Sequence, residues 1–117
     1  MEMGKLNQAQ FEFMEDLGKL LNYIYAQGYT CSGAELYRTP EQAILNAKKG
    51  TGVAKSAHIQ RLAIDLNLFK NGVYLQETDA HKPFGDYWKL LRVDNRWGGD
   101  FKRRDGNHYS KEFGGVA

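Results

Sequence analysis

The stretch SAHIQRLAIDLNLF, residues 56–69, contains the pattern that decides the fold. Apolar residues recur at every second position of its second half, as in a half-buried β-strand: Leu62, Ile64, Leu66 and Leu68. Side chains of a strand alternate between two faces, so Asp65 lies on the opposite face among small and polar neighbours. An unpaired carboxylate is too costly to bury in a core. We therefore expect this second face to line a cleft.

His58 stands seven residues before that acid. A bend of the chain near Arg61 would bring the imidazole beside the carboxylate of Asp65. Another acid and histidine, Asp105 and His108, occur three residues apart in the tail. Together His58, Asp65 and His108 form a ligand set that leaves a fourth position open, the arrangement used by catalytic zinc. Asp105 is then a spare carboxylate that can handle the proton of the bound water.

Spacing alone leaves other interpretations open. Asp65 also fits a solvated residue or an ion-pair partner of Arg61, and His108 fits an ordinary loop histidine. His81 competes as a ligand, although AHKPFG, residues 80–85, is typical of a loop that leads into a helix. His81 also lacks a neighbouring acid of matching geometry.

A long helix is predicted ahead of the strand. Asn7 and Gln10 have the spacing of a capping box, and Gly28 is a natural stop. The apolar residues of this helix fall on one stripe, which we expect to face the core: Phe11, Met14, Leu17, Leu21, Ile24 and Tyr25.

Residues 29–38 are predicted to be extended, with a bulge or turn at Gly33. A short helix should follow, because Thr39 is a good cap, Pro40 suits the first turn and Gly50 can end it.

Asn71 and Gly72, after the central strand, predict a tight hairpin turn. Pro83 should start a third helix, with an apolar face made of four residues: Tyr87, Trp88, Leu90 and Leu91. The tail, residues 96–117, is expected to be mostly loop with one short strand. The predicted fold class is α+β, a small antiparallel sheet with flanking helices. A length of 117 residues leaves room for a single domain, residues 1–117.

Composition limits the classes of function. The chain has 16 basic and 14 acidic residues, and a net charge of +2 is too small to indicate a nucleic-acid partner. The one cysteine, Cys31, fits a small buried hydrophobe better than a catalytic thiol. No apolar run approaches the roughly 20 residues that span a membrane, and the N-terminus lacks the features of a signal peptide. We therefore expect a protein that is made in a cytoplasm without a signal peptide and is not inserted into a membrane. We also expect a monomer.

Three motifs together resemble the zinc peptidases of bacterial cell walls. They are S-x-H-x-x-x-x-A-x-D at 56–65, WGGDF at 97–101 and D-x-x-H at 105–108. That family includes D-Ala-D-Ala carboxypeptidases and dipeptidases, and the L-alanyl-D-glutamate endopeptidases that phages use as endolysins. The chain is most similar to the small single-domain phage form, from about Leu6 to Tyr109.

This resemblance implies a single zinc peptidase domain with Zn²⁺ as cofactor. His58, Asp65 and His108 would be the ligands, and Asp105 the general base and acid. The implied substrate is the peptide stem of peptidoglycan, hydrolysed at an amide bond.

Further roles are implied for residues around the ligands. Arg38, in LYRTPEQ, would hold the developing oxyanion. Ser56 would contact substrate or support a ligand, and Trp97 would form a wall of the site. The chain departs from the family at Arg61, where glycine is usual. Arginine does not take positive φ angles at low cost, so we expect either a different turn here or a turn that needs no positive φ.

An aspartate at position 105, where the dipeptidase branch has glutamate, favours an L-alanyl-D-glutamate endopeptidase over a D-Ala-D-Ala carboxypeptidase. The implied role is that of a phage or prophage endolysin, acting on the cell wall after holin-type release. One alternative is a non-lytic virion-associated or wall-binding protein of the same fold. Another is a metal-dependent nuclease, suggested by KRRDGNH at 102–108. The basic run 102–104 fits a solvated face, or attraction to anionic wall polymer.

Overall fold

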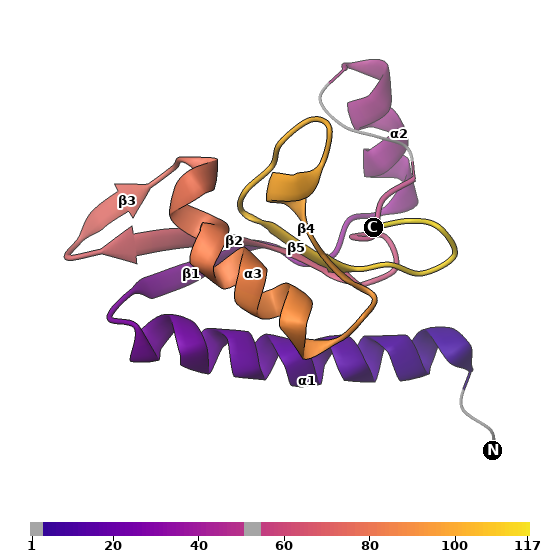
Figure 1. Cartoon of the computed structure of the whole chain (residues 1–117). Helices are drawn as coiled ribbons and strands as arrows, with labels where there is room; N and C mark the ends of the chain where they lie inside the picture. The colour runs from indigo at the N-terminus through magenta and orange to yellow at the C-terminus, as the bar shows by residue number, and fades with distance from the viewer. Residues whose placement is uncertain (1–3, 51–54) are drawn as a thin grey trace.

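The strand predicted from the alternating pattern is the centre of the sheet. A computed structural model describes residues 4–50 and 55–117. Within them, the antiparallel sheet has the order β1-β2-β5-β4, and β3 pairs with β2 beyond the end of β5 (Figure 1). The strands are β1 (Thr30–Glu35), β2 (Ala63–Lys70), β3 (Val73–Leu75), β4 (Asn95–Trp97) and β5 (His108–Lys111). The α+β class expected from the sequence is confirmed.

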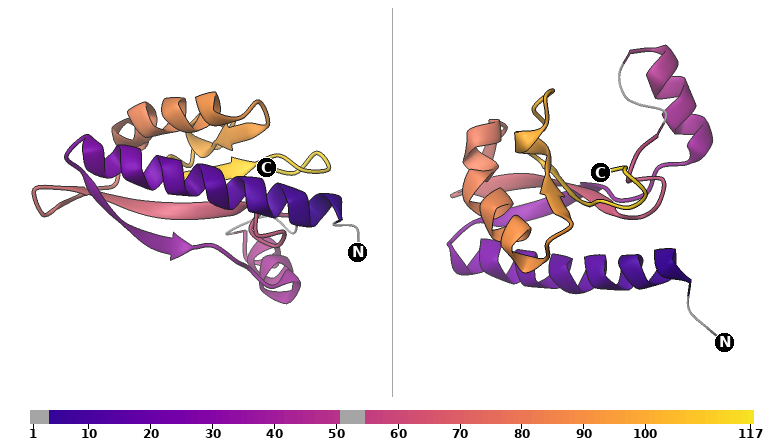
Figure 2. Two further views of the ribbon diagram at one scale, coloured as in Figure 1. Left: turned by 90° about the horizontal axis from the view of Figure 1, so that it is seen from below. Right: turned by 45° about the vertical axis from the view of Figure 1, so that its right-hand side comes forward.

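Two of the three described α-helices, α1 (Lys5–Ala26) and α3 (Lys82–Leu91), pack against each other and the sheet. The third, α2 (Pro40–Lys48), stands away from them, as both views in Figure 2 show. Two short 3-10 turns, η1 (Thr78–His81) and η2 (Gly98–Asp100), precede α3 and follow β4. No described helix is long and apolar enough to cross a membrane.

Helix α1 is present as predicted, but a different stripe is buried. Its N-cap is Gly4, without a side-chain cap, and Asn7 contacts Gln10 from inside the helix. Phe11 and Met14 are more than half exposed, so the expected core stripe is wrong at these positions. Tyr25 is also exposed, and Leu21 is half-buried. The buried residues of α1 are Ala9, Phe13, Asp16, Leu17, Leu20 and Ile24.

The local turn signals are confirmed. Thr39 caps α2 by accepting a hydrogen bond from the backbone N–H of Gln42, at 3.1 Å. The register of β1 against β2 shifts between Gly33 and Glu35, which is the expected bulge. Asn71 has a φ of 51° and Gly72 a φ of 77°, so both adopt the left-handed conformation that a tight hairpin requires.

The tail contributes two strands where one was expected. β5 lies between β2 and β4, in the middle of the sheet. All four of its residues are buried, so its sequence, HYSK, shows no alternation between apolar and polar positions. Helix α3 also differs from the expectation at Leu90, which is 85% exposed, whereas Trp88 is fully buried.

Ion pairs fix the long helix to this central part of the sheet. Asp16, with no exposed surface, accepts hydrogen bonds from Arg92 at 2.9 and 3.2 Å and from Asn95 at 3.1 Å. Lys111, at the end of β5, is buried and pairs with Asp94 at 2.7 Å and with Glu12 of α1 at 3.2 Å. These contacts hold β5, and therefore His108 at its start, in register with the core.

Candidate metal centre

Two of the three predicted ligands face each other across the sheet. Asp65 of β2 and His108 of β5 are directly paired in the antiparallel register. Cross-strand partners in such a pair place their Cβ atoms about 4.5–5.5 Å apart on one face. His58 reaches the same point from the turn that precedes β2, as the sequence predicted.

The ligand atoms of these residues point at one another. Oδ1 of Asp65 lies 3.3 Å from Nε2 of His58 and 3.4 Å from Nδ1 of His108. One ligand atom from each residue lies within 4.8 Å of the other two. Zinc bonds of about 2.0–2.2 Å in a tetrahedron separate neighbouring ligand atoms by about 3.4 Å. Oδ1 is also buried without a well-formed hydrogen bond among the described residues, so the three residues fit a zinc ion.

The turn that carries His58 ends at Arg61. The N–H of Leu62 bonds to the carbonyl of Ala57 at 3.0 Å, and the N–H of Arg61 to that of His58 at 3.2 Å. This pair of bonds defines a Schellman motif, whose left-handed position is usually glycine. Arg61 occupies it with a φ of 57°. The turn therefore does need a positive φ at this position. The guanidinium of Arg61 lies 4.0 Å from the ring centre of Tyr37, which is a cation–π contact.

Neighbouring groups orient the imidazole of His58. The backbone N–H of His58 donates to Oγ of Ser56 at 3.2 Å, so this hydroxyl stabilises the turn. Nδ1 of His58 lies 3.3 Å from the carbonyl oxygen of Leu36. A carbonyl only accepts, so the proton of the neutral ring sits on Nδ1 and leaves the lone pair of Nε2 free for a metal.

The electrostatics of the cluster favour a charged carboxylate. Burial raises the pKa of Asp65, but the close imidazoles of His108 and His58 outweigh it and lower this pKa to about 2. Burial lowers the pKa of His58, and Asp65 more than offsets this, so the pKa is raised. The site therefore presents an ionised carboxylate between two imidazoles over the range of ordinary pH.

Asp105 lines the same cavity without belonging to the ligand cluster. Burial, and secondarily the charge of Asp65, raises the pKa of Asp105 from its ordinary value. A carboxylate that lines this cavity without belonging to the ligand cluster is available as a general base and acid. The cavity has a volume of about 650 Å³.

The WGGDF motif explains how the loop that carries Asp105 is shaped. The N–H of Asp105 donates to the carbonyl of Gly98 at 2.9 Å. A Cβ at Gly98 would lie only 2.1 Å from the carbonyl oxygen of Asp105, so no other residue fits there. Trp97 is buried beneath this loop and donates to the carbonyl of Gly106 at 2.7 Å. Trp97 is not among the residues that line the metal-site cavity, so it supports the loop instead of forming the expected wall.

Arg38 lines the cavity and is held by an acid that the sequence did not single out. Its guanidinium forms an ion pair with Glu35, whose carboxylate also lies 3.7 Å from Nε2 of His58. The Nε–H of Arg38 is buried without a partner among the described residues. Glu35 stands in a segment with no motif, and only its spacing of three residues from Arg38 could have drawn attention to it.

The basic run of the tail also reaches the site. Lys102, Arg103 and Arg104 line the cavity, so they are more than a distant solvated face. Phe101 lines it as well, and its ring centre lies 5.4 Å from that of His108. Among these residues, Arg104 is tied to Asp79 by a hydrogen bond of 2.6 Å.

His81 is separate from the ligand cluster. It lies at the end of η1, buried, and its Nδ1 is 2.8 Å from the hydroxyl of Tyr109. Burial lowers the pKa of His81 to about 4, so the ring is neutral at ordinary pH.

Comparisons with solved structures agree with this fold. The chain resembles the L-Ala D-Glu endopeptidase ChiX of Serratia marcescens, with a TM-score of 0.68 and 18% identity over 96% of this chain and 90% of that one. It also resembles VanY, the D,D-pentapeptidase of a VanB-type vancomycin resistance cassette, solved as a mutant with Zn(II). There the TM-score is 0.56, with 16% identity over 85% of this chain and 70% of that one. At these identities the likeness concerns the fold.

The family follows from the sequence match. No curated protein matches the chain significantly. The model of the D-alanyl-D-alanine carboxypeptidase family matches residues 49–111, more than half of the chain. This span contains all three predicted ligands, Asp105 and the WGGDF motif. The chain therefore belongs to the D-alanyl-D-alanine carboxypeptidase family, the zinc peptidases of bacterial cell walls that its motifs resemble.

Proposed function

We propose that this protein is a zinc metallopeptidase that hydrolyses an amide bond in the peptide stem of bacterial peptidoglycan. One observation carries the proposal. His58, Asp65 and His108 converge on a single point in a cavity of about 650 Å³, and a carboxylate that is not a ligand, Asp105, lines the same cavity. A binding module needs no such carboxylate.

Each residue has a separate task in this reaction. Bound zinc supplies an electrophile that polarises the scissile carbonyl and acidifies water. Asp105 accepts the proton of the attacking water and returns it to the leaving amine. Arg38 donates to the carbonyl oxygen as negative charge develops on it, while Glu35 holds the guanidinium in place.

The favoured bond is that between L-alanine and D-glutamate. Asp105 is an aspartate, whereas the dipeptidase branch of the family has glutamate there. The coverage of the solved relatives supports the same choice, because the chain matches 90% of the length of the endopeptidase ChiX and 70% of that of VanY. Release of a terminal D-alanine is the competing reaction.

The proposed role is that of a phage or prophage endolysin. The enzyme would be made in the host cytoplasm, reach the wall after holin-type release and act as a monomer. A non-lytic virion-associated or wall-binding protein of the same fold is the alternative, and the free carboxylate of Asp105 weighs against it.

Digestion of purified peptidoglycan tests the proposal. We expect zinc-loaded protein to release fragments whose masses show new N-terminal D-glutamate, and chelated protein to release none. Asp105→Asn is the matched control, because it keeps the shape of the side chain but cannot accept and return a proton. Release of D-alanine alone would identify the carboxypeptidase. Protein that sediments with the wall but never cleaves it would identify the binding alternative.

A further inference from the structure

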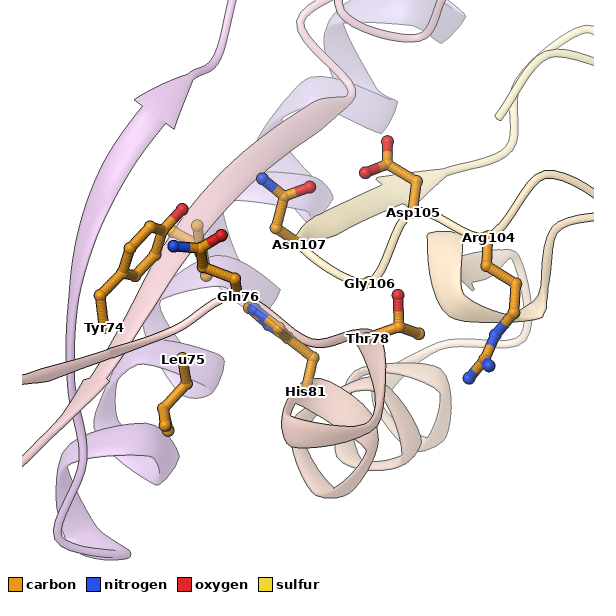
Figure 3. A pocket seen from close by; sticks show the side chains of 10 residues that line it. Tyr74, Leu75, Gln76, Thr78, His81, Arg104, Asp105, Gly106 and Asn107 are labelled. Carbon is orange, nitrogen blue, oxygen red and sulfur yellow. The ribbon is translucent and has the colours of Figure 1, made fainter.

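A second cavity adjoins the metal site on the other side of Asp105. Its volume is about 280 Å³, near the lower end of the ~300–1,000 Å³ typical of small-molecule sites. Figure 3 shows Tyr74 and Gln76 on one side of it and the segment from Arg104 to Asn107 on the other. Arg104 and Asp105 line both cavities. The two cavities are therefore neighbours that share these two residues of their lining.

Neutral hydrogen-bonding groups line the second cavity. The side chains of Gln76, Thr78 and Asn107 form no hydrogen bond with any other described residue. His81 is only 2% exposed, and one of its ring nitrogens bonds to Tyr109 while the ring also lines the cavity. Buried polar atoms are usually hydrogen-bonded. The second ring nitrogen of His81, Nε2, is therefore available to bond a ligand in this cavity.

Most of the groups that line the cavity are uncharged, which favours a neutral ligand over an ionic one. Arg104 is neutralised by Asp79 at 2.6 Å. Asp105 is the one carboxylate among the described lining residues, and it also lines the metal-site cavity. Tyr74 adds an aromatic ring that is 46% exposed. Two amides, a hydroxyl, a neutral imidazole and an exposed ring suit a ligand with hydroxyl and acetamido groups, such as an N-acetylated sugar.

The proposed reaction places such a sugar next to the scissile bond. In peptidoglycan the first residue of the stem, L-alanine, is joined to the lactyl group of N-acetylmuramic acid. A cut after that alanine leaves one residue, about 3.3–3.6 Å of extended chain, between the cut bond and the lactyl group. A cut at the far end of the stem would leave the sugar several residues away.

We propose that the cavity between Gln76 and Asn107 binds the muramyl sugar, so that the enzyme prefers stems still attached to the glycan. This inference rests on the proposed function. It also makes the choice of bond testable, since a sugar in this cavity is compatible with the endopeptidase reaction and not with release of a terminal D-alanine.

The kinetic test compares two substrates that differ only at the N-terminal acyl group. These are a muramyl tetrapeptide and the same tetrapeptide acetylated on its alanine. We expect the wild-type kcat/KM to be about tenfold higher for the muramyl substrate. Gln76→Ala should remove about threefold to tenfold of that advantage, the effect of one lost hydrogen bond, and leave the acetylated substrate unchanged. Glu77→Ala is the matched control, because Glu77 is the exposed neighbour that does not line the cavity.

Equal rates for the two substrates in the wild type would overturn the sugar site. So would an equal loss on both substrates in Gln76→Ala, which would assign Gln76 to the peptide. A preference that depends on added residues at the other end of the stem would make the cavity a peptide subsite.

A binding test separates this inference from the reaction itself. Zinc-free wild-type protein is titrated with N-acetylglucosaminyl-N-acetylmuramic acid whose lactyl carboxyl has been converted to the amide, as in the substrate. The side-chain amide signals of Gln76 and Asn107 are followed by NMR. We expect both signals to shift in the wild type. In Gln76→Ala the Asn107 signal should shift only at about threefold to tenfold higher sugar concentration. Shifts without any zinc-dependent hydrolysis would contradict the proposed function and leave the sugar site standing. Zinc-dependent hydrolysis without these shifts would contradict the sugar site and leave the proposed function standing.

Discussion

The two cavities on either side of Asp105 contain the three histidines of the chain in two different settings. In the metal-site cavity, His58 and His108 share the carboxylate of Asp65 at 3.3 and 3.4 Å. In the second cavity, His81 contacts the uncharged hydroxyl of Tyr109 at 2.8 Å. All three imidazoles are buried. The pKa of His58 is nevertheless raised by Asp65, while that of His81 is lowered to about 4 by burial.

The difference shows that a neighbouring carboxylate, and not burial, distinguishes the two histidines predicted as metal ligands from the third histidine. A lone pair aimed at an ionised oxygen creates a point of negative potential that a cation can occupy. A lone pair aimed at a hydroxyl is already satisfied. Sheet pairing produces the first situation here, because Asp65 and His108 stand opposite each other in neighbouring strands.

Removing metal ligands should give the largest effect. We expect His58→Ala and His108→Ala to lose zinc and all measurable hydrolysis, and His81→Ala to keep one zinc per chain. Metal analysis of the purified variants checks this. Chelation of the wild type should also abolish activity but leave a folded, less stable protein, because none of the three predicted ligands is part of the hydrophobic core. Loss of the far-UV dichroism on chelation would instead make the zinc structural.

The second largest effect should distinguish the roles of the two carboxylates in the metal-site cavity, Asp105 and Asp65. Asp105→Ala is expected to keep zinc and fold while losing about 10²–10⁴-fold in turnover, the usual contribution of proton transfer. Asp105→Asn should behave alike, and Asp65→Ala should lose the zinc itself. Metal content and kcat are measured on the same samples. Near-normal wall hydrolysis by Asp105→Ala would reject the proton-transfer role of Asp105. Zinc loss in Asp105→Ala but not in Asp65→Ala would instead make Asp105 the ligand and Asp65 the proton-transfer group.

The third prediction concerns His81 and pH. Its pKa is about 4 in the folded protein and about 6.5 when unfolded, so the unfolded state binds the proton more readily. The stability it contributes is complete above about pH 6.5 and is lost as the pH falls toward 4, by on the order of 3 kcal/mol. Denaturant unfolding of chelated protein at several pH values should show this loss relative to His81→Gln, whose side chain does not titrate. Parallel curves for the two proteins would contradict it.

Local signals in the sequence predicted the parts of the fold that depend on neighbours along the chain. The alternation in β2 and the Asn71-Gly72 turn belong to this class, as does the cap at Thr39. The stripe of α1 did not, because this helix carries two apolar rows. Which row is buried depends on α3 and the sheet, so Phe13 is in the core and Phe11 is exposed.

The residues of the site also fall into those that the sequence predicted and those that only the folded structure reveals. The ligands and Asp105 stood out because their residue types and spacing match a chemical task. β5 was hidden, since a central strand with paired polar residues such as Lys111 has no alternating pattern. Glu35 was missed because only the folded sheet brings it beside Arg38 and His58.

The smallest expected effect concerns the turn that carries His58 into the metal-site cavity. A residue other than glycine in the left-handed conformation costs about 1–2 kcal/mol, and Arg61 has a φ of 57°. Its cation–π contact with Tyr37 returns about 0.5–1 kcal/mol at such an exposed position. Arg61→Ala loses the cation–π contact and keeps the backbone strain. Arg61→Gly also loses the contact but relieves the strain. We therefore expect the glycine variant to be more stable than the alanine variant by about 1 kcal/mol, measured by denaturant unfolding. At an ordinary position the order is opposite, because glycine gains more freedom on unfolding. The sign of the difference thus reports whether the Schellman turn exists in solution, and an alanine variant that is the more stable of the two would show that it does not.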